Sequence, residues 1–372
     1  MKILMINVVC GIRSTGRICT DLADELTKQG NEVKIAYGRG EVPEKYKKYA
    51  VKIGNSVDQK MHAIKTRLFD EHGFGSKKVT KDFLLWAESY KPDMLWLHNI
   101  HGYYINIEML FDWIKVHPTL SVKWTLHDCW AFTGHCSYFT KVQCNQWESR
   151  CQKCIQKRSY PGSMLRDNCS KNFERKKVAF TGVKKMMLIT PSMWLAELVK
   201  KSFLSEYPVE VCYNTIDTSV FKPTLSDFKS KFDLEGKRII LGVASIWDDR
   251  KGFDDFLELS EMLDKSYVIV LVGLNDKQIK RLPSNIVGIK RTNSPGELAA
   301  IYTAADVFVN PTYEDNYPTV NLEAKACGTP VITYRTGGSV ESVEVENIVD
   351  VGDISALYKR IICVTNKKEE EK

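Results

Sequence analysis

The sequence predicts an α/β protein of two domains, each built on a parallel sheet. The chain has 372 residues, whereas a single hydrophobic core rarely extends beyond about 250–300 residues. Short apolar runs alternate with longer amphipathic stretches, which is typical of buried parallel strands covered by helices on both faces. This alternation starts again after Pro208, and the restart indicates the second domain.

In the first half, short apolar runs predict strands and stretches with helical spacing predict the helices over them. Strands are expected at residues 3–8, 33–37, 94–97, 122–126 and 187–190. Helices are expected at residues 15–29 and 107–116, and Ser192 is the expected N-cap of a helix at 194–202. The turn-rich stretch 214–223 is the best linker, and we place the domain boundary near residue 205.

The second half repeats the pattern. Strands are expected at residues 239–243, 267–272, 286–289, 307–309 and 331–334, with helices at 253–263, 297–305 and 320–326. Residues 366–372 are expected to form a frayed, charged tail. Ligands of doubly wound sheets bind beyond the carboxyl ends of the strands. Two such sheets are expected to face one central cleft, and the site is sought in the loops at that edge.

The composition is that of a globular protein, with 44% hydrophobic and 27% charged residues. No run of about 18 apolar residues exists, so no membrane-spanning helix is expected. The start MKILMINVVC lacks a cleavage site and predicts a buried strand instead of a signal peptide. Eleven cysteines without a secretion signal favour a reducing compartment, so a cytoplasmic location is expected.

Positive charge is concentrated in one segment. The net charge is +7, yet residues 150–201 hold 13 Lys and Arg against 3 Asp and Glu, an excess of 10 positive charges. Such a segment suits an anionic partner: a membrane face, a phosphorylated substrate or nucleic acid. The alternative is a solvated helical face without a partner.

Residues 310–330 have the pattern of a diphosphate site. A strand ends at Asn310, and Pro318 stands near the first helical position, where a missing N–H costs nothing. The amides of the first turn, residues 319–321, are therefore expected to point at an anion. Glu323, one turn further on, is placed to accept hydrogen bonds from ribose hydroxyls.

A second loop brings cations to the same edge. The strand at 239–243 leads into Arg250 and Lys251, just before a helix. Two cations there would neutralise a diphosphate and stabilise it as a leaving group. Arg-Lys-Gly alone is more often a solvated turn, and a Pro-initiated helix with one Glu is common. Both patterns at one sheet edge favour the anion site.

These residues resemble a known family. Residues 313–331 read Tyr-Glu-Asp-Asn-Tyr-Pro-Thr-Val-Asn-Leu-Glu-Ala-Lys-Ala-Cys-Gly-Thr-Pro-Val. This resembles the acidic pair, with seven residues between the two acids, of retaining GT-B glycosyltransferases of family 4. That family includes bacterial enzymes of polysaccharide and lipid glycosylation. Residues 214–223 resemble the linker of that family, and residues 336–341 its late Gly-Gly loop. The resemblance covers nearly the whole chain and implies a GT-B fold with two Rossmann-like domains.

The resemblance assigns roles in the second half. Glu323 is the ribose-binding acid, and Asp315 stands where the family usually has a Glu that contacts the donor sugar. Lys251 matches the lysine of the family's Lys-Gly turn, while its partner arginine falls on Ser245, so Arg250 is expected to supply that charge. The other expected donor-binding residues are Asn316, Tyr317, Thr319, Val320 and Gly16.

In the first half, His127 and Asp128 follow a strand. The resemblance implies that His127 faces the donor sugar and the reaction centre. It also implies that the loop from Gly11 to Gly16 contacts the acceptor or the diphosphate, although a plain strand–helix turn has the same pattern. Asp128 and His101 are expected on the acceptor side, and His101 has packing as its alternative.

The expected reaction moves a sugar from a nucleotide-diphosphate donor, a UDP- or GDP-sugar, to a hydroxyl of a glycan or lipid-linked acceptor with retention. No Asp-x-Asp motif occurs, which fits a metal-independent site without a catalytic cofactor. Peripheral association with the anionic inner face of the membrane is expected, and nucleic acid is not expected as a partner.

Three alternative functions account for less of the pattern. A sugar-nucleotide epimerase of the same fold would not need the basic segment. A membrane- or nucleic-acid-binding module would leave Glu323 and Lys251 without a role. An NAD enzyme would need Gly-x-Gly-x-x-Gly after the first strand, which is missing.

An insertion at about residues 129–170 carries a cysteine cluster. Cys136, Cys144, Cys151 and Cys154 have the spacing C-x7-C-x6-C-x2-C, which ends in a common zinc half-site. The segment has little apolar periodicity, and a metal would stabilise it. The sequence therefore predicts a structural zinc, with free thiols or disulfides as alternatives.

Overall fold

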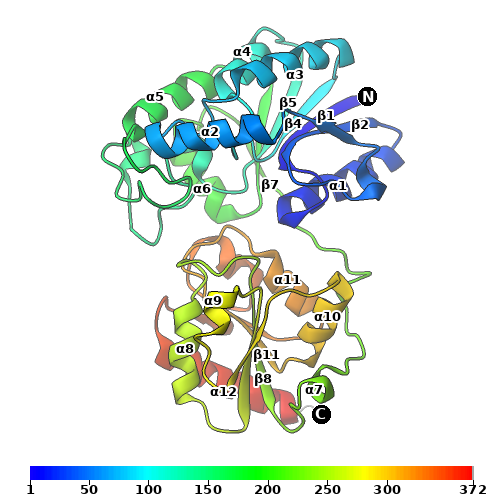
Figure 1. The fold of residues 1–372 in the computed structure, drawn as a ribbon, viewed down its shortest axis with the longest axis vertical. Coiled ribbons are helices and arrows are strands. Elements are labelled where there is room, and N and C mark those ends of the chain that lie inside the picture. Colours follow the sequence, from blue (N-terminus) through cyan, green and yellow to red (C-terminus); the bar gives the residue numbers. More distant parts are fainter. Residues whose placement is uncertain (371–372) are drawn as a thin grey trace. The chain divides into compact units, whose positions relative to one another are not determined.

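The computed structural model describes residues 1–370 and the side chains of residues 1–367. The chain forms two compact units, of which unit 1 is Met1–Tyr213 and unit 2 begins at Asn214 (Figure 1). Within the described residues, no helix has the length and apolar character needed to cross a membrane.

Unit 1 has a sheet of seven parallel strands in the order β3-β2-β1-β4-β5-β6-β7. The strands are β1 (Lys2–Val9), β2 (Glu32–Arg39), β3 (Ala50–Lys52), β4 (Met94–Leu97), β5 (Ser121–Thr125), β6 (Met186–Thr190) and β7 (Val209–Val211). The helices are α1 (Arg13–Lys28), α2 (Ser56–Phe69), α3 (Lys77–Tyr90), α4 (Ile107–Lys115), α5 (Cys169–Phe180) and α6 (Met193–Lys201).

Unit 2 has a sheet of six parallel strands in the order β10-β9-β8-β11-β12-β13. The strands are β8 (Arg238–Val243), β9 (Tyr267–Val272), β10 (Ile286–Ile289), β11 (Val307–Asn310), β12 (Val331–Tyr334) and β13 (Ile348–Val349). The helices are α7 (Phe228–Lys231), α8 (Phe253–Met262), α9 (Asp276–Ile279), α10 (Pro295–Ala304), α11 (Thr319–Ala326) and α12 (Ile354–Glu370).

Both sheets bury side chains on both faces, which explains why their strands are continuous apolar runs. Along β1, Leu4 and Ile6 belong to the core layer on one face, and Ile3 and Met5 to the layer on the other. All six residues of β9 are buried in the same way. The strand–helix alternation of the sequence therefore predicts the two parallel sheets correctly.

The structure corrects the expected domain boundary and the expected tail. The first unit ends after Tyr213 and not near residue 205, because β7 still pairs with β6 in its sheet. The tail is not frayed over residues 366–370, which belong to α12. Residues 371–372 lie outside the described residues. The Ser192 cap is confirmed, since its side chain accepts a hydrogen bond from the Leu195 N–H at 3.1 Å.

Candidate functional site

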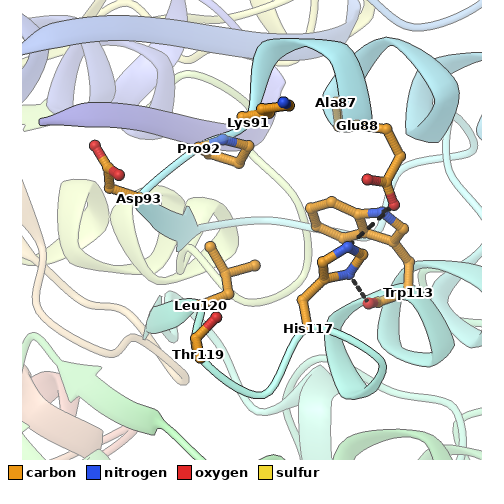
Figure 2. Close-up of a pocket in the computed structure, with 9 residues that line it drawn as sticks. All are labelled: Ala87, Glu88, Lys91, Pro92, Asp93, Trp113, His117, Thr119 and Leu120. Atoms are coloured by element: carbon orange, nitrogen blue, oxygen red, sulfur yellow. Dashed lines mark hydrogen bonds and ion pairs between the residues drawn. The ribbon is translucent and has the colours of Figure 1, made fainter.

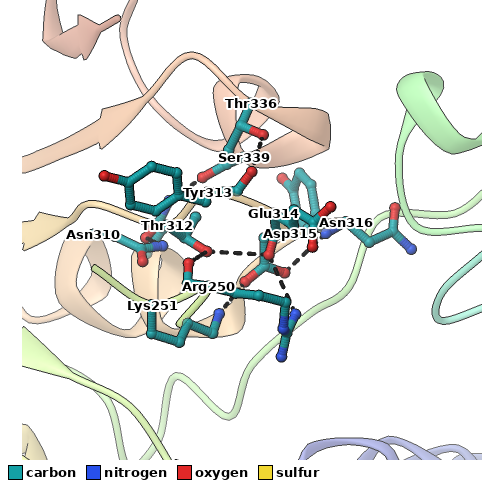
Figure 3. Close-up of polar contacts among 12 residues, drawn as sticks. Arg250, Lys251, Asn310, Thr312, Tyr313, Glu314, Asp315, Asn316, Thr336 and Ser339 are labelled. Carbon is teal, nitrogen blue, oxygen red and sulfur yellow. Dashed lines mark hydrogen bonds and ion pairs between the residues drawn. The ribbon is translucent and has the colours of Figure 1, made fainter. Parts of the chain in front are cut away.

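The candidate site lies in unit 2, where two neighbouring strands reach their carboxyl ends. β8 pairs with β11, so the loops that follow them, residues 244–252 and 311–318, start from one sheet edge. Figure 3 shows the polar side chains of these loops together. This is the edge at which doubly wound sheets bind ligands.

Lys251 and Asp315 form an ion pair between the two loops. Lys251 Nζ lies 2.5 Å from Asp315 Oδ2, and each side chain keeps a minor part of its surface exposed (21% and 16%). Arg250, beside it, contacts the Asp248 carboxylate at 3.1 Å and donates to the Glu314 carbonyl at 3.4 Å. Two cations, each paired with a carboxylate, therefore meet at the edge where a diphosphate and a sugar were expected (Figure 3).

Backbone hydrogen bonds hold the two loops together. The Tyr313 N–H donates to the Arg250 carbonyl at 2.7 Å, and the Thr312 hydroxyl donates to the same oxygen at 3.2 Å. Trp247 anchors the loop of residues 244–252 to the sheet, because its indole N–H donates to the Val272 carbonyl at the end of β9 at 2.9 Å. The positions of Arg250 and Lys251 are thus fixed by the backbone.

Two glycines allow this close approach. A Cβ on Gly252 would lie 2.3 Å from the Pro311 carbonyl oxygen, and one on Gly337 would lie 2.0 Å from the Asp315 carbonyl oxygen. Both residues also have a positive φ, of 67° and 50°, which side chains oppose. Gly337, in the late Gly-Gly loop, therefore packs directly on the backbone of the residue that pairs with Lys251.

Helix α11 begins beside this ion pair. Pro318 is its N-cap, one position earlier than expected, and no side chain of the described residues caps it. The expectation for the Asn321 amide is wrong, because that N–H donates to the Pro318 carbonyl at 3.2 Å. Thr319 and Val320 supply the amides of the first two helical positions.

Glu323 lies in the second turn of α11 and is buried. The Tyr302 hydroxyl, on α10, donates to its Oε2 at 3.1 Å and so orients the carboxylate. Sequence reasoning missed Tyr302, because the contact joins side chains that are distant along the chain. The positions of Glu323 and its neighbours follow from the strand–turn–helix pattern alone.

A buried polar network supports the start of α11. The Asn310 amide donates to Asn321 Oδ1 at 2.9 Å, and Asn321 Nδ2 donates to Ser342 Oγ at 2.8 Å. The Thr333 and Ser339 hydroxyls lie 2.7 Å apart in the same network. It ties β11, β12 and the loop of residues 337–342 to the helix, and no local signal in the sequence predicted it.

The remaining donor-side residues of unit 2 differ in exposure. Asn316 is buried and its N–H donates to Asp315 Oδ1 at 2.9 Å. The Tyr317 carbonyl accepts a hydrogen bond from Asn214 at 3.1 Å. Ser245 is exposed at the start of its loop. These placements are compatible with donor contacts, which stay predictions.

In unit 1, two His-containing pairs occupy the carboxyl ends of β4 and β5. His98 Nδ1 lies 3.1 Å from His127 Nε2, with the two rings stacked. His101 Nε2 lies 3.1 Å from Asp128 Oδ2. His98 begins the stretch 98–104, for which the sequence left open a place in the acceptor groove or a role in packing; its contact with His127 was not predicted. The structure therefore joins His127 to His98, and Asp128 to His101.

The loop after β1 closes on itself. The Gly11 N–H donates to the Gly16 carbonyl at 3.1 Å, and Gly11 has a φ of 71°. A Cβ on Gly11 would lie 2.6 Å from the ring of Tyr46. Close packing within unit 1 thus accounts for Gly11. The expected contacts of this loop with a ligand stay predictions.

The four cysteines of the insertion are free thiols around one small cavity, which Cys169 also lines. A hydrogen bond from Cys136 lowers the pKa of the Cys154 thiol to about 7, and the Gly134 N–H donates to Cys151 Sγ at 3.3 Å. No group of three or more His, Cys, Asp or Glu among the described residues is arranged to hold a metal ion. Zinc therefore stays a prediction for metal analysis of the purified protein.

A separate cavity of about 370 Å³ lies in unit 1 (Figure 2). Its wall includes residues 91–93 before β4 and residues 119–120 before β5, so it lies at the amino ends of these strands. Glu88 there accepts from the Trp113 indole at 2.6 Å and pairs with His117 at 3.1 Å. This is the edge of the sheet opposite to the candidate residues, and none of them contributes to it.

Burial keeps several histidines of unit 1 neutral. It lowers the pKa of His62 and of His127 to about 4, and it lowers the pKa of His72 and His98 well below 6.5. Between pH 6.5 and about 4 the unfolded chain therefore binds protons that the folded chain does not. The free energy of unfolding is therefore highest above pH 6.5, and it decreases as the pH falls towards 4.

We expect the thermal unfolding midpoint to fall steeply between pH 6.5 and 4.5. At 1.36 kcal/mol per pKa unit, His62 and His127 each account for about 3 kcal/mol. His135 acts in the opposite direction, because the Asp70 hydrogen bond and charge outweigh its burial and raise its pKa. Unfolding scans at a series of pH values measure the sum, and a midpoint that is constant from pH 7 to pH 5 would contradict the expectation.

Comparisons with known proteins agree with this geometry. Residues 237–367 match the family described as Glycosyl transferases group 1, a range that includes Lys251, Asp315 and Glu323. The putative colanic acid biosynthesis glycosyl transferase WcaC of Escherichia coli K12 is 24% identical over 357 residues, which are 92% of this chain and 85% of that protein.

Solved structures show the fold. Sucrose-phosphate synthase of Thermosynechococcus elongatus superposes with a TM-score of 0.74 at 17% identity, over 98% of this chain and 90% of that one. HepE of Anabaena in complex with UDP-glucose has a TM-score of 0.66 at 13% identity, over 99% and 91%. The fold is GT-B, as the resemblance implied. The sequence matches support glycosyltransferase activity, and they do not favour the epimerase alternative.

Proposed function

We propose that the protein is a retaining, metal-independent hexosyltransferase of family 4 that uses a nucleotide-diphosphate sugar as donor. The observation that carries this proposal is the Lys251–Asp315 pair, with Arg250 beside it, at the start of α11. A diphosphate needs cations and helix amides, whereas a sugar needs a carboxylate next to them. Both kinds of group meet here.

In the proposed reaction, the bond between the anomeric carbon and the diphosphate breaks and a bond to the acceptor oxygen forms on the same face. The acceptor proton passes to a diphosphate oxygen. Negative charge grows on the leaving diphosphate, and Lys251, Arg250 and the first amides of α11 stabilise it. Glu323, held by Tyr302, binds the ribose. We assign no protein nucleophile.

The Asp315 carboxylate has a second role in this proposal. Because it pairs with Lys251 at 2.5 Å, it keeps the ammonium group at the edge of the sheet before the donor binds. When the diphosphate arrives, Lys251 can bind the phosphate oxygens and leave Asp315 to accept from a sugar hydroxyl. We also propose that His127, which burial keeps neutral above pH 6.5, acts at the donor sugar.

The proposed donor is a UDP- or GDP-sugar. The HepE complex with UDP-glucose supports a nucleotide sugar in this fold. The similarity to WcaC, a colanic acid biosynthesis protein by name, supports a glycan or lipid-linked acceptor in polysaccharide biosynthesis. We further propose a cytoplasmic enzyme that associates peripherally with the membrane.

A thermal-shift screen with UDP-, GDP-, ADP- and dTDP-sugars tests the donor site. A ligand at a hundredfold its Kd stabilises the folded protein by about 2.7 kcal/mol. We expect one nucleotide class to raise the unfolding midpoint, and Glu323→Ala to remove most of the shift. No shift with any of the four classes, or an equal shift in the variant, would overturn the assignment. Conversion of the sugar nucleotide into its epimer without an acceptor, and without net release of nucleoside diphosphate, would instead indicate the epimerase.

A further inference from the structure

Helix α2 turns its apolar side away from the protein. Its buried residues are His62 and Thr66, both polar. His62 accepts the Gly73 and Gly75 N–H groups at 3.2 Å each, so polar contacts fix the helix. The opposite side carries Val57, Met61 and Ile64, which are at least half exposed. A helix of a globular protein normally buries such residues and exposes the polar ones.

The cysteine-rich insertion extends this apolar side. The Met164 N–H donates to the Arg67 carbonyl at 2.7 Å, and the Arg166 N–H donates to the Leu68 carbonyl at 3.3 Å. Residues 164–166 therefore lie against the end of α2, and their loops are beside it in Figure 1. Met164 and Leu165 are 68% and 65% exposed. Together with Phe69, these side chains and the apolar side of α2 form what we call the α2–insertion face.

The two segments that form the α2–insertion face are rich in basic residues. Segments 56–69 and 155–166 contain six basic residues and one acidic residue. The acidic residue is Asp58, whose carboxylate accepts from the Asn55 N–H in the capping box of α2. The basic residues are Lys60, Lys65, Arg67, Lys157, Arg158 and Arg166. No ion pair to an acidic side chain occupies any of the six within the part of the chain that the structure describes. Arg166 instead lies over the Phe69 ring at 5.6 Å.

The basic residues of segment 150–201 therefore do not form one surface. Lys176 is fully buried and donates to the Trp130 and Thr133 carbonyls. Arg175 is held by Glu108 through two hydrogen bonds. The exposed cations of the insertion instead combine with those of α2, which lies outside that segment.

We propose that the α2–insertion face docks on an anionic membrane surface. Its aliphatic side chains would enter the headgroup region, and the cations of the two segments would meet lipid phosphates. This inference rests on the peripheral association proposed above and names the surface responsible. It is distinct from the donor site, because none of its residues is among those assigned to donor binding or catalysis.

Two other occupants fit the face less well. A second copy in a symmetric dimer would place the same excess of positive charge against itself. Single-stranded nucleic acid would need aromatic platforms for its bases. The aromatic member of this face, Phe69, lies under Arg166, and the most exposed members are Val57, Met61, Met164 and Leu165. Aliphatic groups together with cations are the complement of an anionic bilayer.

Vesicle co-sedimentation of the full-length protein tests the proposal. Wild type should bind vesicles that contain phosphatidylglycerol, bind pure phosphatidylcholine much more weakly, and lose binding as salt rises. Lys60→Ala with Lys65→Ala should weaken binding about thirtyfold, or about fivefold for each charge. Met164→Asp with Leu165→Asp should weaken it at least about tenfold.

Val116→Asp is the matched control, since Val116 is 71% exposed at the end of α4, away from this face. It should bind vesicles as wild type does. Unchanged binding of the Met164/Leu165 variant, equal binding of wild type to both vesicles, or a dimer that this variant dissociates would overturn the proposal. Donor binding, measured without vesicles, should be unchanged in every variant. Its loss in wild type would count against the donor site alone.

Discussion

Replacing Lys251 with alanine is expected to lower kcat/KM for sugar transfer by about 100- to 1000-fold. This is the usual effect of removing one group that stabilises developing negative charge. Lys251 Nζ stands at the carboxyl edge of β8 and β11, beside Arg250 and the start of α11. Its loss would leave the leaving diphosphate with one cation fewer and the Asp315 carboxylate without its partner. Steady-state kinetics with the donor from the screen measure the effect.

Lys325→Ala is the control for this experiment. Lys325 also pairs with a carboxylate, Glu344 at 2.8 Å, but at an exposed position on α11. Exposed ion pairs contribute little to stability, so this variant should keep wild-type rates. Wild-type turnover in Lys251→Ala would refute the role of Lys251. A rise in KM with an unchanged kcat would indicate binding of the donor without stabilisation of the transition state.

Gly337→Ala is expected to cost about 3 kcal/mol or more of stability and to abolish transfer. A left-handed backbone alone costs a non-glycine residue about 1–2 kcal/mol. The added Cβ would also lie 2.0 Å from the Asp315 carbonyl oxygen, and a backbone atom cannot move aside as a flexible side chain can. The loop that carries Asp315 would have to shift away from Lys251. Chemical unfolding and transfer assays follow the two consequences.

Gly236→Ala separates the clash from the backbone strain. Gly236 has a φ of 73°, but nothing lies within 4 Å of an added Cβ. This control should lose only the backbone contribution and keep full activity. If both alanine variants lose the same stability and Gly337→Ala still transfers sugar at the wild-type rate, the close approach of residues 315 and 337 does not hold the site together.

The sequence carries most of the information about the elements. The strands at 94–97, 267–272, 286–289 and 331–334 lie where the apolar runs predict them. Parallel strands buried on both faces leave a strong local signal, since nearly all of their residues are apolar. Helices α2, α3, α5, α7, α9 and α12 were not predicted. For α2 the reason is physical, because its buried face is polar and its apolar face is exposed.

Part of the candidate site, too, could be predicted from the sequence. The sequence predicted Arg250 and Lys251 in the loop after one strand and Glu323 in the helix after another, at the edge where such sheets bind ligands, and the structure has them there. Their roles stay predictions. The linker at 214–223 was also found, and unit 2 begins at its first residue. The boundary itself was misplaced, because β7 is a short edge strand with a weak apolar pattern.

By itself, then, the sequence determined two parallel α/β sheets, the edge that carries the polar residues, and the acids and cations expected to act there. These features depend on strands and turns, which the periodicity and spacing of a short stretch of sequence are enough to predict. The pairs of side chains that contact each other are seen in the tertiary structure alone. They are Lys251 with Asp315, His127 with His98, and Glu323 with Tyr302. The tertiary structure alone also placed residues 164–166 against α2. Such contacts join segments far apart in the chain, and their energy depends on distance and burial, which no short stretch of sequence encodes.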